Sequence, residues 1–165
     1  MRISGLVNDS IVDGPGLRFT VFTQGCKHKC PGCHNPGTHD FNGGYEMSVE
    51  DIISEIKKNP LLDGVTLSGG DPMFQVEESL KLAKEVKKLG LNVMLYTGFT
   101  FERIIEMAKD NPSYKEILNY LDYLVDGPFI LKLRDLTLQF RGSQNQRIID
   151  VPHYLQTNEI KAIEL

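Results

Sequence analysis

The sequence predicts an α/β fold with a mainly parallel sheet, arranged as a partial, open (β/α) barrel. Strand and helix signals alternate along the chain, which is the order typical of parallel sheets whose strands are connected through helices. The chain has 165 residues, whereas a complete (β/α)₈ barrel takes about 250, so the barrel should be incomplete. No linker, repeat or low-complexity segment divides the chain, and one domain is expected over residues 1–165.

The predicted strands are short, apolar segments rich in β-branched residues, covering residues 17–23, 65–67, 91–96 and 123–125. An unusual polar or glycine-rich segment follows each of them. Because the carboxyl ends of parallel strands share one edge of a sheet, and ligands bind at that edge, we expect these segments to form one site. They begin at Cys26, Gly69, Thr97 and Asp126.

The helices are predicted from apolar residues at helical spacing and from capping residues. Ser48 should cap a helix that ends before Pro60, and Thr100 should cap a helix through Ala108. Ser113 with Glu116 should form a capping box. The expected helices therefore cover residues 49–59, 76–89, 101–108 and 114–120.

Composition excludes several classes of partner. Hydrophobic residues make up 41% of the chain and the formal net charge is −4, without the basic patch that a nucleic-acid binder carries. No apolar run approaches the ~18 residues of a membrane span, and the first residues lack the apolar stretch of a signal peptide. We therefore expect a cytoplasmic protein without nucleic-acid or membrane partners.

The chain has three cysteines, Cys26, Cys30 and Cys33, in a C-x₃-C-x₂-C pattern. Thiols stay reduced in the cytoplasm, and disulfides between such close positions would gain little loop entropy. Iron–sulfur clusters usually take four cysteines. With three, one iron of a [4Fe–4S] cluster would be open to a small molecule, as catalytic rather than structural metal sites require.

A zinc site is the alternative interpretation of the same residues. Cys₃His sites exist, and His28, His34 or His39 could supply the fourth ligand. Structural zinc ligands usually come as two separated pairs, whereas this chain has one tight triplet. The cysteine spacing alone favours an iron–sulfur cluster over a zinc site only modestly.

Around the cysteines the sequence resembles the radical S-adenosylmethionine superfamily, whose hallmark is C-x₃-C-x₂-C. Residues 12–18 (VDGPGLR), 22–26 (FTQGC) and 33–36 (CHNP) resemble its glycyl-radical-enzyme activases. Residues 67–72 (LSGGDP) match the superfamily's Gly-Gly-Glu motif, with Asp in place of Glu.

Two late motifs narrow the resemblance. Residues 124–129 (LVDGPF) and 140–147 (FRGSQNQR) resemble the activases of anaerobic ribonucleoside-triphosphate reductase, so the similarity runs from about Val12 to Val151. It implies that the chain generates a glycyl radical on that reductase by reductive cleavage of S-adenosylmethionine at a [4Fe–4S] cluster. The implied partners are the reductase and a low-potential electron donor such as flavodoxin or ferredoxin.

The resemblance also implies roles for individual residues. Cys26, Cys30 and Cys33 would ligate three irons, and the amino and carboxylate groups of S-adenosylmethionine would chelate the fourth. No catalytic residue is implied beyond the cluster and this cofactor. Gly32 stands where the superfamily often has an aromatic residue, so adenine stacking must come from elsewhere. The residues implied to contact S-adenosylmethionine are Gly32, Cys33 and His34 (adenosyl part), Gly69, Gly70 and Asp71 (methionine part), and Thr97 and Gly98 (ribose or carboxylate).

Three points stay open from the sequence. A radical S-adenosylmethionine enzyme acting on a small molecule, such as a deazapurine synthase, would share the cysteine motif, although a short, open barrel encloses a small substrate poorly. A zinc-bearing binding module is the other alternative. The segment from Arg141 to Arg147 is polar and rich in donors, and it could either dock the partner or brace the fold.

Overall fold

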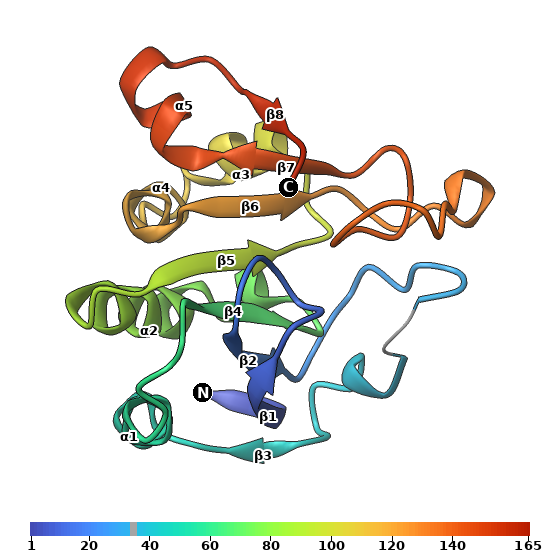
Figure 1. Cartoon of the computed structure of the whole chain (residues 1–165). Helices are drawn as coiled ribbons and strands as arrows, with labels where there is room; N and C mark the ends of the chain where they lie inside the picture. The colour runs from blue at the N-terminus through green and yellow to red at the C-terminus, as the bar shows by residue number, and fades with distance from the viewer. Residues whose placement is uncertain (34–35) are drawn as a thin grey trace.

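The computed structural model describes residues 1–33 and 36–165, and one eight-stranded sheet in the order β3-β1-β2-β4-β5-β6-β7-β8 forms its centre (Figure 1). Strands β3 and β8 are its two edges, so the sheet is open rather than closed into a barrel. The strands are β1 Arg2–Ser10, β2 Arg18–Thr23, β3 Tyr45–Glu46, β4 Gly64–Gly69, β5 Asn92–Tyr96, β6 Tyr123–Asp126, β7 Arg147–Asp150 and β8 Ala162–Ile163.

The four central strands β2, β4, β5 and β6 are parallel, which confirms the predicted α/β class and the parallel arrangement of the predicted strands. Thr23 at the end of β2 pairs with Gly69 at the end of β4, so their carboxyl ends lie at the same edge. Figure 1 shows the loop after β2 and the segment between β6 and β7 projecting from this side of the sheet.

The outer strands β1, β3, β7 and β8 pair antiparallel, and the sequence pattern did not predict them. Strand β1 mixes buried and exposed positions and contains Gly5, while β3 and β8 have two residues each. Short or mixed strands at a sheet edge lack the continuous apolar run that marks a buried parallel strand. They widen the sheet without closing it.

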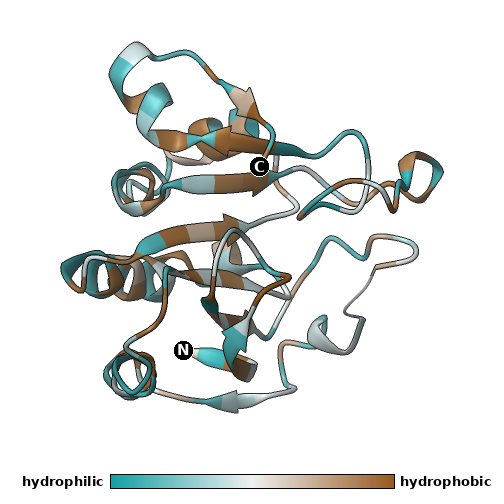
Figure 2. Cartoon of the chain, viewed as in Figure 1, coloured by the Kyte–Doolittle hydropathy of each residue, from teal (hydrophilic) through white to brown (hydrophobic). Residues whose placement is uncertain are grey.

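The helices are α1 Val49–Lys57, α2 Val76–Lys88, α3 Phe101–Met107, α4 Ser113–Glu116 and α5 Val151–Thr157. They contact one another in a continuous layer, α1 against α2, α2 against α4 and α4 against α3. Figure 2 shows hydrophobic residues concentrated along the central strands. In the part of the chain that the structure describes, no helix is long and apolar enough to cross a membrane.

Strand β5 shows how the two sheet faces differ, because its side chains alternate. Val93 and Leu95 belong to the main core under the helices, whereas Met94 packs with Val125 and Ile148 in a smaller cluster on the other face. All five are at most 1% exposed. The second face is the inner surface of the partial barrel, and its apolar floor lies below the candidate site.

Two of the predicted caps are confirmed and one is wrong. Ser48 and Thr100 accept hydrogen bonds from the backbone N–H three residues later, at 3.1 and 3.2 Å. Ser113 is not a cap, because the helix is capped at Pro112 and the Ser113 N–H donates to Asn111 Oδ1 at 3.0 Å. The fixed φ of proline starts the helix one residue earlier, and residues 117–120 continue it as a 3₁₀ helix.

Candidate active site

The loops after β2, β4, β5 and β6 meet in one pocket of about 120 Å³ at the carboxyl edge of the sheet. Six residues singled out from the sequence line it: Cys26, Cys30, Cys33, Gly70, Thr97 and Gly98. Tyr96, Phe129 and Gln146 line it as well; Phe129 and Gln146 belong to the two late motifs, but the sequence assigned none of the three to the cofactor site. A larger groove of about 450 Å³ lies on the outer face between α3, α4 and α5, away from the cysteines.

The cysteine loop is held by backbone hydrogen bonds at its start. The N–H groups of Gly25 and Cys26 donate to the carbonyls of Thr38 and His39 at 2.7 and 3.1 Å. Gly25 has φ +113°, a conformation that L side chains rarely adopt, and an added Cβ would lie 2.4 Å from the Phe41 ring. These contacts hold the start of the cysteine loop against residues 38–41.

The three thiols differ in exposure. Cys26 is 8% exposed, and burial raises the pKa of its thiol to about 11, whereas Cys30 and Cys33 are partly exposed. All three lie in the described part of the chain, and no disulfide joins them. Because thiolate is the form that binds metal, metal binding must displace the proton of Cys26.

The donor set fits a cluster with one open iron. Within residues 1–33 and 36–165, no three cysteine, histidine or carboxylate side chains converge closely enough to hold a single metal ion. Thiols that bind different irons of one cluster need not converge on a point. Three thiols on one loop, facing one pocket in a chain without a fourth cysteine, suit a [4Fe–4S] cluster whose remaining iron binds another molecule.

Asp71 lies outside the set of residues lining the pocket and connects the loops behind it. Its side chain is fully buried, and Oδ1 accepts a hydrogen bond from Met73 N at 3.0 Å, which caps the short helix η2 (Pro72–Gln75). Its Oδ2 accepts from Thr97 Oγ1 and Gly98 N, both at 2.9 Å, and contacts His28 Nε2 at 2.6 Å. One carboxylate thus joins the loops after β2, β4 and β5.

The two glycines before Asp71 are packed against backbone. Gly69 has φ +97°, and a Cβ there would lie 2.4 Å from Thr23 N. A Cβ on Gly70 would lie 2.5 Å from the carbonyl oxygen of Gly25 and 2.8 Å from that of Thr38. Among the described residues, Gly70 lines the pocket and Gly69 does not. The Gly-Gly pair therefore brings β4 against the base of the cysteine loop.

The segment between β1 and β2 folds over the inner face of the sheet. The buried guanidinium of Arg18 donates to the carbonyl of Pro15 at 2.9 Å and to Thr66 Oγ1 at 2.7 Å. Thr66 in turn donates to the Asp13 carbonyl at 3.0 Å, and Thr20 donates to the Asp13 carboxylate at 3.1 Å. These bonds fix the VDGPGLR motif beside the site, where Asp13 lines a second cavity of about 340 Å³.

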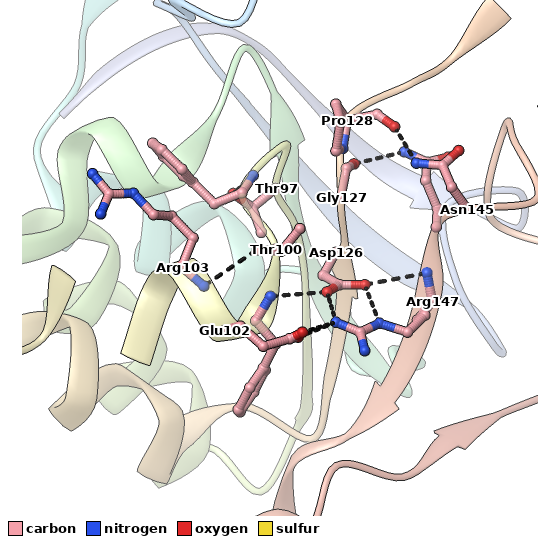
Figure 3. Close-up of polar contacts among 12 residues, drawn as sticks. Thr97, Thr100, Glu102, Arg103, Asp126, Gly127, Pro128, Asn145 and Arg147 are labelled. Atoms are coloured by element: carbon pink, nitrogen blue, oxygen red, sulfur yellow. Dashed lines mark hydrogen bonds and ion pairs between the residues drawn. The ribbon is translucent and has the colours of Figure 1, made fainter. Parts of the chain in front are cut away.

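The late motifs brace each other, as Figure 3 shows around Asp126. Asp126 is 1% exposed, accepts from Phe101 N at 2.8 Å, and pairs with Arg147, which also pairs with Glu102 (Figure 3). These carboxylates raise the pKa of Arg147, and the hydrogen bond from Arg147 lowers that of Glu102. The network joins β6 and β7 to the start of α3.

The neighbouring side chains of the same motif hold the backbone that borders the pocket. Asn145 Nδ2 donates to the Pro128 carbonyl at 2.7 Å, and Gln146 Nε2 donates to the Gly127 carbonyl at 3.1 Å. Of the two roles left open for Arg141 to Arg147, these contacts support bracing, while Gln144 is exposed to solvent. Gln146 both braces the loop and lines the pocket.

Gly32, a predicted contact of S-adenosylmethionine, lies where the cysteine loop meets the segment after β6. Gly32 has φ +75°, and a Cβ there would lie 3.0 Å from Leu131 and 3.3 Å from the Phe129 ring, so the cysteine loop packs against the segment after β6. His34 lies outside the described residues. The contact between His28 and Asp71, 43 residues apart, had no local signal in the sequence.

Comparisons with known proteins agree with these motifs. The model of the family described as a 4Fe-4S single cluster domain matches residues 12–149. The anaerobic ribonucleoside-triphosphate reductase-activating proteins of Escherichia coli (strain K12) and Vibrio cholerae are 35% and 40% identical, covering 88% and 84% of this chain and 94% and 90% of theirs.

Two further matches are more distant. The pyruvate formate-lyase-activating enzyme of Listeria monocytogenes is 33% identical over 96% of this chain and 64% of its own length. The crystal structure of QueE from Escherichia coli is similar in fold, with a TM-score of 0.50 and 19% identity over 60% of this chain and 53% of that one. The chain therefore belongs to the 4Fe–4S single cluster domain family and to the family of anaerobic ribonucleoside-triphosphate reductase-activating proteins.

Proposed function

We propose that this chain, acting as one domain over residues 1–165, activates anaerobic ribonucleoside-triphosphate reductase by generating a glycyl radical on it. The family supports an activating role. The observation that carries the proposal is the pocket in which the three cysteines face Gly70, Thr97 and Gly98. A [4Fe–4S] cluster and S-adenosylmethionine are the two groups that this set of residues would hold together.

Different residues of the site would bind the [4Fe–4S] cluster and S-adenosylmethionine. Cys26, Cys30 and Cys33 would hold three irons. Backbone from Gly32 to His34 would lie against the adenosyl part of S-adenosylmethionine, and Thr97 and Gly98 against its ribose or carboxylate. Phe129 lines the pocket beside Gly32, and its ring would supply the aromatic surface that Gly32 lacks.

The Gly69-Gly70-Asp71 segment would hold the methionine part. Gly70 borders the pocket, whereas the Asp71 carboxylate is committed to Met73, Thr97, Gly98 and His28. Asp71 would therefore act mainly by fixing the backbone that meets the ligand. When bound, the cluster and S-adenosylmethionine supply one-electron cleavage of the sulfonium and removal of a hydrogen atom from a glycine of the partner.

The chain's own contribution is position and exclusion of water. Met94, Val125 and Ile148 form a dry floor on the inner face. The second cavity adjoins the pocket, since Cys33, Tyr96, Phe129 and Gln146 line both. Because the sheet is open, we propose that a glycine-bearing loop of the reductase enters this cavity and covers the site.

The reductant is proposed to be a low-potential carrier such as flavodoxin or ferredoxin. Lys27 and Lys29 are exposed on the cysteine loop, on the side of the site that an acidic carrier could approach. A cytoplasmic location suits this chemistry, because thiols stay reduced there.

Electron paramagnetic resonance tests the proposal. Reduced protein, S-adenosylmethionine and reductase are mixed without oxygen, and a stable glycyl doublet should appear on the reductase. The doublet should be absent with Cys30→Ala. Formation of 5′-deoxyadenosine at full yield without a radical on the reductase would contradict the proposal and favour a small-molecule substrate.

A further inference from the structure

His28 is the middle residue of the x₃ segment between Cys26 and Cys30, yet its side chain is folded into the protein. The side chain is 17% exposed. Its ring lies against the rings of Phe74 and Phe99, with centroid distances of 5.3 and 4.6 Å. A histidine on a metal-binding loop that turns toward the protein interior is available to connect that loop to another element.

The partner of His28 is the buried carboxylate of Asp71, at 2.6 Å from Nε2 to Oδ2. An ionised carboxylate only accepts hydrogen bonds, so the Nε2–H group of the imidazole is the donor. The same oxygen accepts from Thr97 Oγ1 and Gly98 N. Three loops therefore meet at this oxygen: the segment after β4, which carries Asp71, the cysteine loop through the His28 side chain, and the segment after β5 through a hydroxyl and a backbone amide.

The His28 ring packs closely against the backbone of Gly98. A Cβ on Gly98 would lie 2.5 Å from the His28 ring, so the imidazole rests on the backbone of the segment proposed to meet S-adenosylmethionine. Lys29, next in the chain, has φ +51°, a left-handed conformation that turns the loop back toward Cys30. The position of His28 thus fixes where the cysteine loop stands relative to Thr97 and Gly98.

We propose that His28 is a positioning residue that sets the spacing between the cluster and the S-adenosylmethionine site through Asp71. The inference rests on the function proposed above and adds a residue outside the metal-ligand set. Residues behind a metal site commonly orient the groups that bind, and losing one costs about 10–100-fold in affinity or activity. The competing explanation is that the ring only fills space between Phe74 and Phe99.

Two substitutions separate these explanations. His28→Phe keeps an aromatic ring between the phenylalanines and removes the donor, whereas His28→Gln keeps an N–H donor with similar reach. In metal-free protein, hydrogen exchange of the Gly98 amide should be faster in His28→Phe than in wild type, and closer to wild type in His28→Gln, because exchange reports local opening of this segment. This measurement does not depend on the cluster.

The loaded protein gives the second readout. After anaerobic reconstitution, His28→Phe should keep the iron content of wild type while its dissociation constant for S-adenosylmethionine rises about tenfold, with partial recovery in His28→Gln.

Two outcomes would contradict the inference, and a third would contradict only the proposed function. Wild-type exchange and wild-type affinity in His28→Phe would show that the ring is only a filler. Loss of iron in proportion to affinity would assign His28 to cluster assembly instead. If wild type itself bound no S-adenosylmethionine, the proposed function would fail, while the exchange rate of the Gly98 amide would still decide whether His28 positions that segment.

Discussion

At the scale of single residues, the site depends on close backbone contacts that only glycine permits. Gly25, Gly69 and Gly70 each have backbone or ring atoms within 2.6 Å of where a Cβ would stand. For Gly69 and Gly70, the atoms close to the Cβ position belong to the backbone of β2 and of the cysteine loop. Backbone atoms cannot rotate away as a flexible side chain can. The Gly-Gly pair is therefore a packing requirement of the cysteine loop as well as a candidate ligand contact.

Gly70→Ala should disturb the cysteine loop itself. The new methyl group would meet the carbonyl oxygens of Gly25 and Thr38, and such overpacking costs about 1–3 kcal/mol. Urea unfolding should show this loss, and iron retained after anaerobic reconstitution should fall. Gly5→Ala is the control, because nothing lies within 4 Å of its Cβ position. Wild-type iron content and stability in Gly70→Ala would show that the cysteine loop accommodates the methyl group.

At the scale of elements, a buried ion pair joins β6, β7 and α3 beside the pocket. Asp126 at the end of β6 is nearly inaccessible, whereas Arg147 and Glu102 are partly exposed. Arg147 also hydrogen-bonds Asp126 Oδ1 through its backbone N–H and its Nε–H, at 3.2 and 3.1 Å. The carboxylate is thus satisfied on several sides, and the loop that follows β6 starts from a fixed point.

Arg147→Ala should leave the buried Asp126 carboxylate short of donors and destabilise the fold by about 1.5–3 kcal/mol. Arg103→Ala is the matched control, because its pair with Glu106 is exposed on both sides and should contribute less than about 1 kcal/mol. Urea unfolding of the two variants measures the difference. Equal stability of the two variants would mean that the network does not fasten β6 to β7.

The same network predicts a pH dependence. Arg147 lowers the pKa of Glu102, so the stabilisation from this pair is fully present above the ordinary carboxyl pKa and is lost as the pH falls through the lowered value. The stability difference between wild type and Arg147→Ala, measured by urea unfolding, should shrink over that acidic range. A difference that stays constant down to the acid transition would contradict the pairing of Glu102 with Arg147.

At the scale of the whole molecule, two strongly exposed apolar residues lie in segments that contribute to the lining of the second cavity. Val12 lines that cavity and is 73% exposed, and Leu136, in the segment after β6, is 79% exposed. Exposed apolar surface can mark an interaction site, so these two side chains are the ones to test for contact with the reductase. They fit the proposal that the reductase completes the site.

Leu136→Glu should weaken activation of the reductase without changing the loaded protein. Iron content and S-adenosylmethionine binding should stay at the wild-type level, while the reductase concentration for half-maximal radical formation should rise about tenfold, which corresponds to about 1.4 kcal/mol. Leu61→Glu is the control, since Leu61 is 76% exposed but precedes β4 at the opposite edge of the sheet. Equal effects of the two substitutions would exclude Leu136 from the interface.

The sequence predicted those parts of the molecule whose signals are local. The strands β2, β4, β5 and β6 are continuous apolar segments, and α1, α2 and α3 have apolar stripes with caps or stops, so both were found. The outer strands β1, β3, β7 and β8 and helix α5 were missed, because they are short or mix buried and exposed positions. In the site, motifs located the cysteines and glycines, whereas the role of His28 and the position of Gln146 depend on contacts between distant segments.

The central claim is that three cysteines hold a [4Fe–4S] cluster with one iron open to S-adenosylmethionine. The most direct measurement combines metal analysis with electron paramagnetic resonance of anaerobically reconstituted, reduced protein before and after S-adenosylmethionine is added. We expect about four irons per chain and a cluster signal that changes when S-adenosylmethionine binds. One tightly bound zinc per chain, or a cluster signal that S-adenosylmethionine leaves unchanged, would contradict the claim.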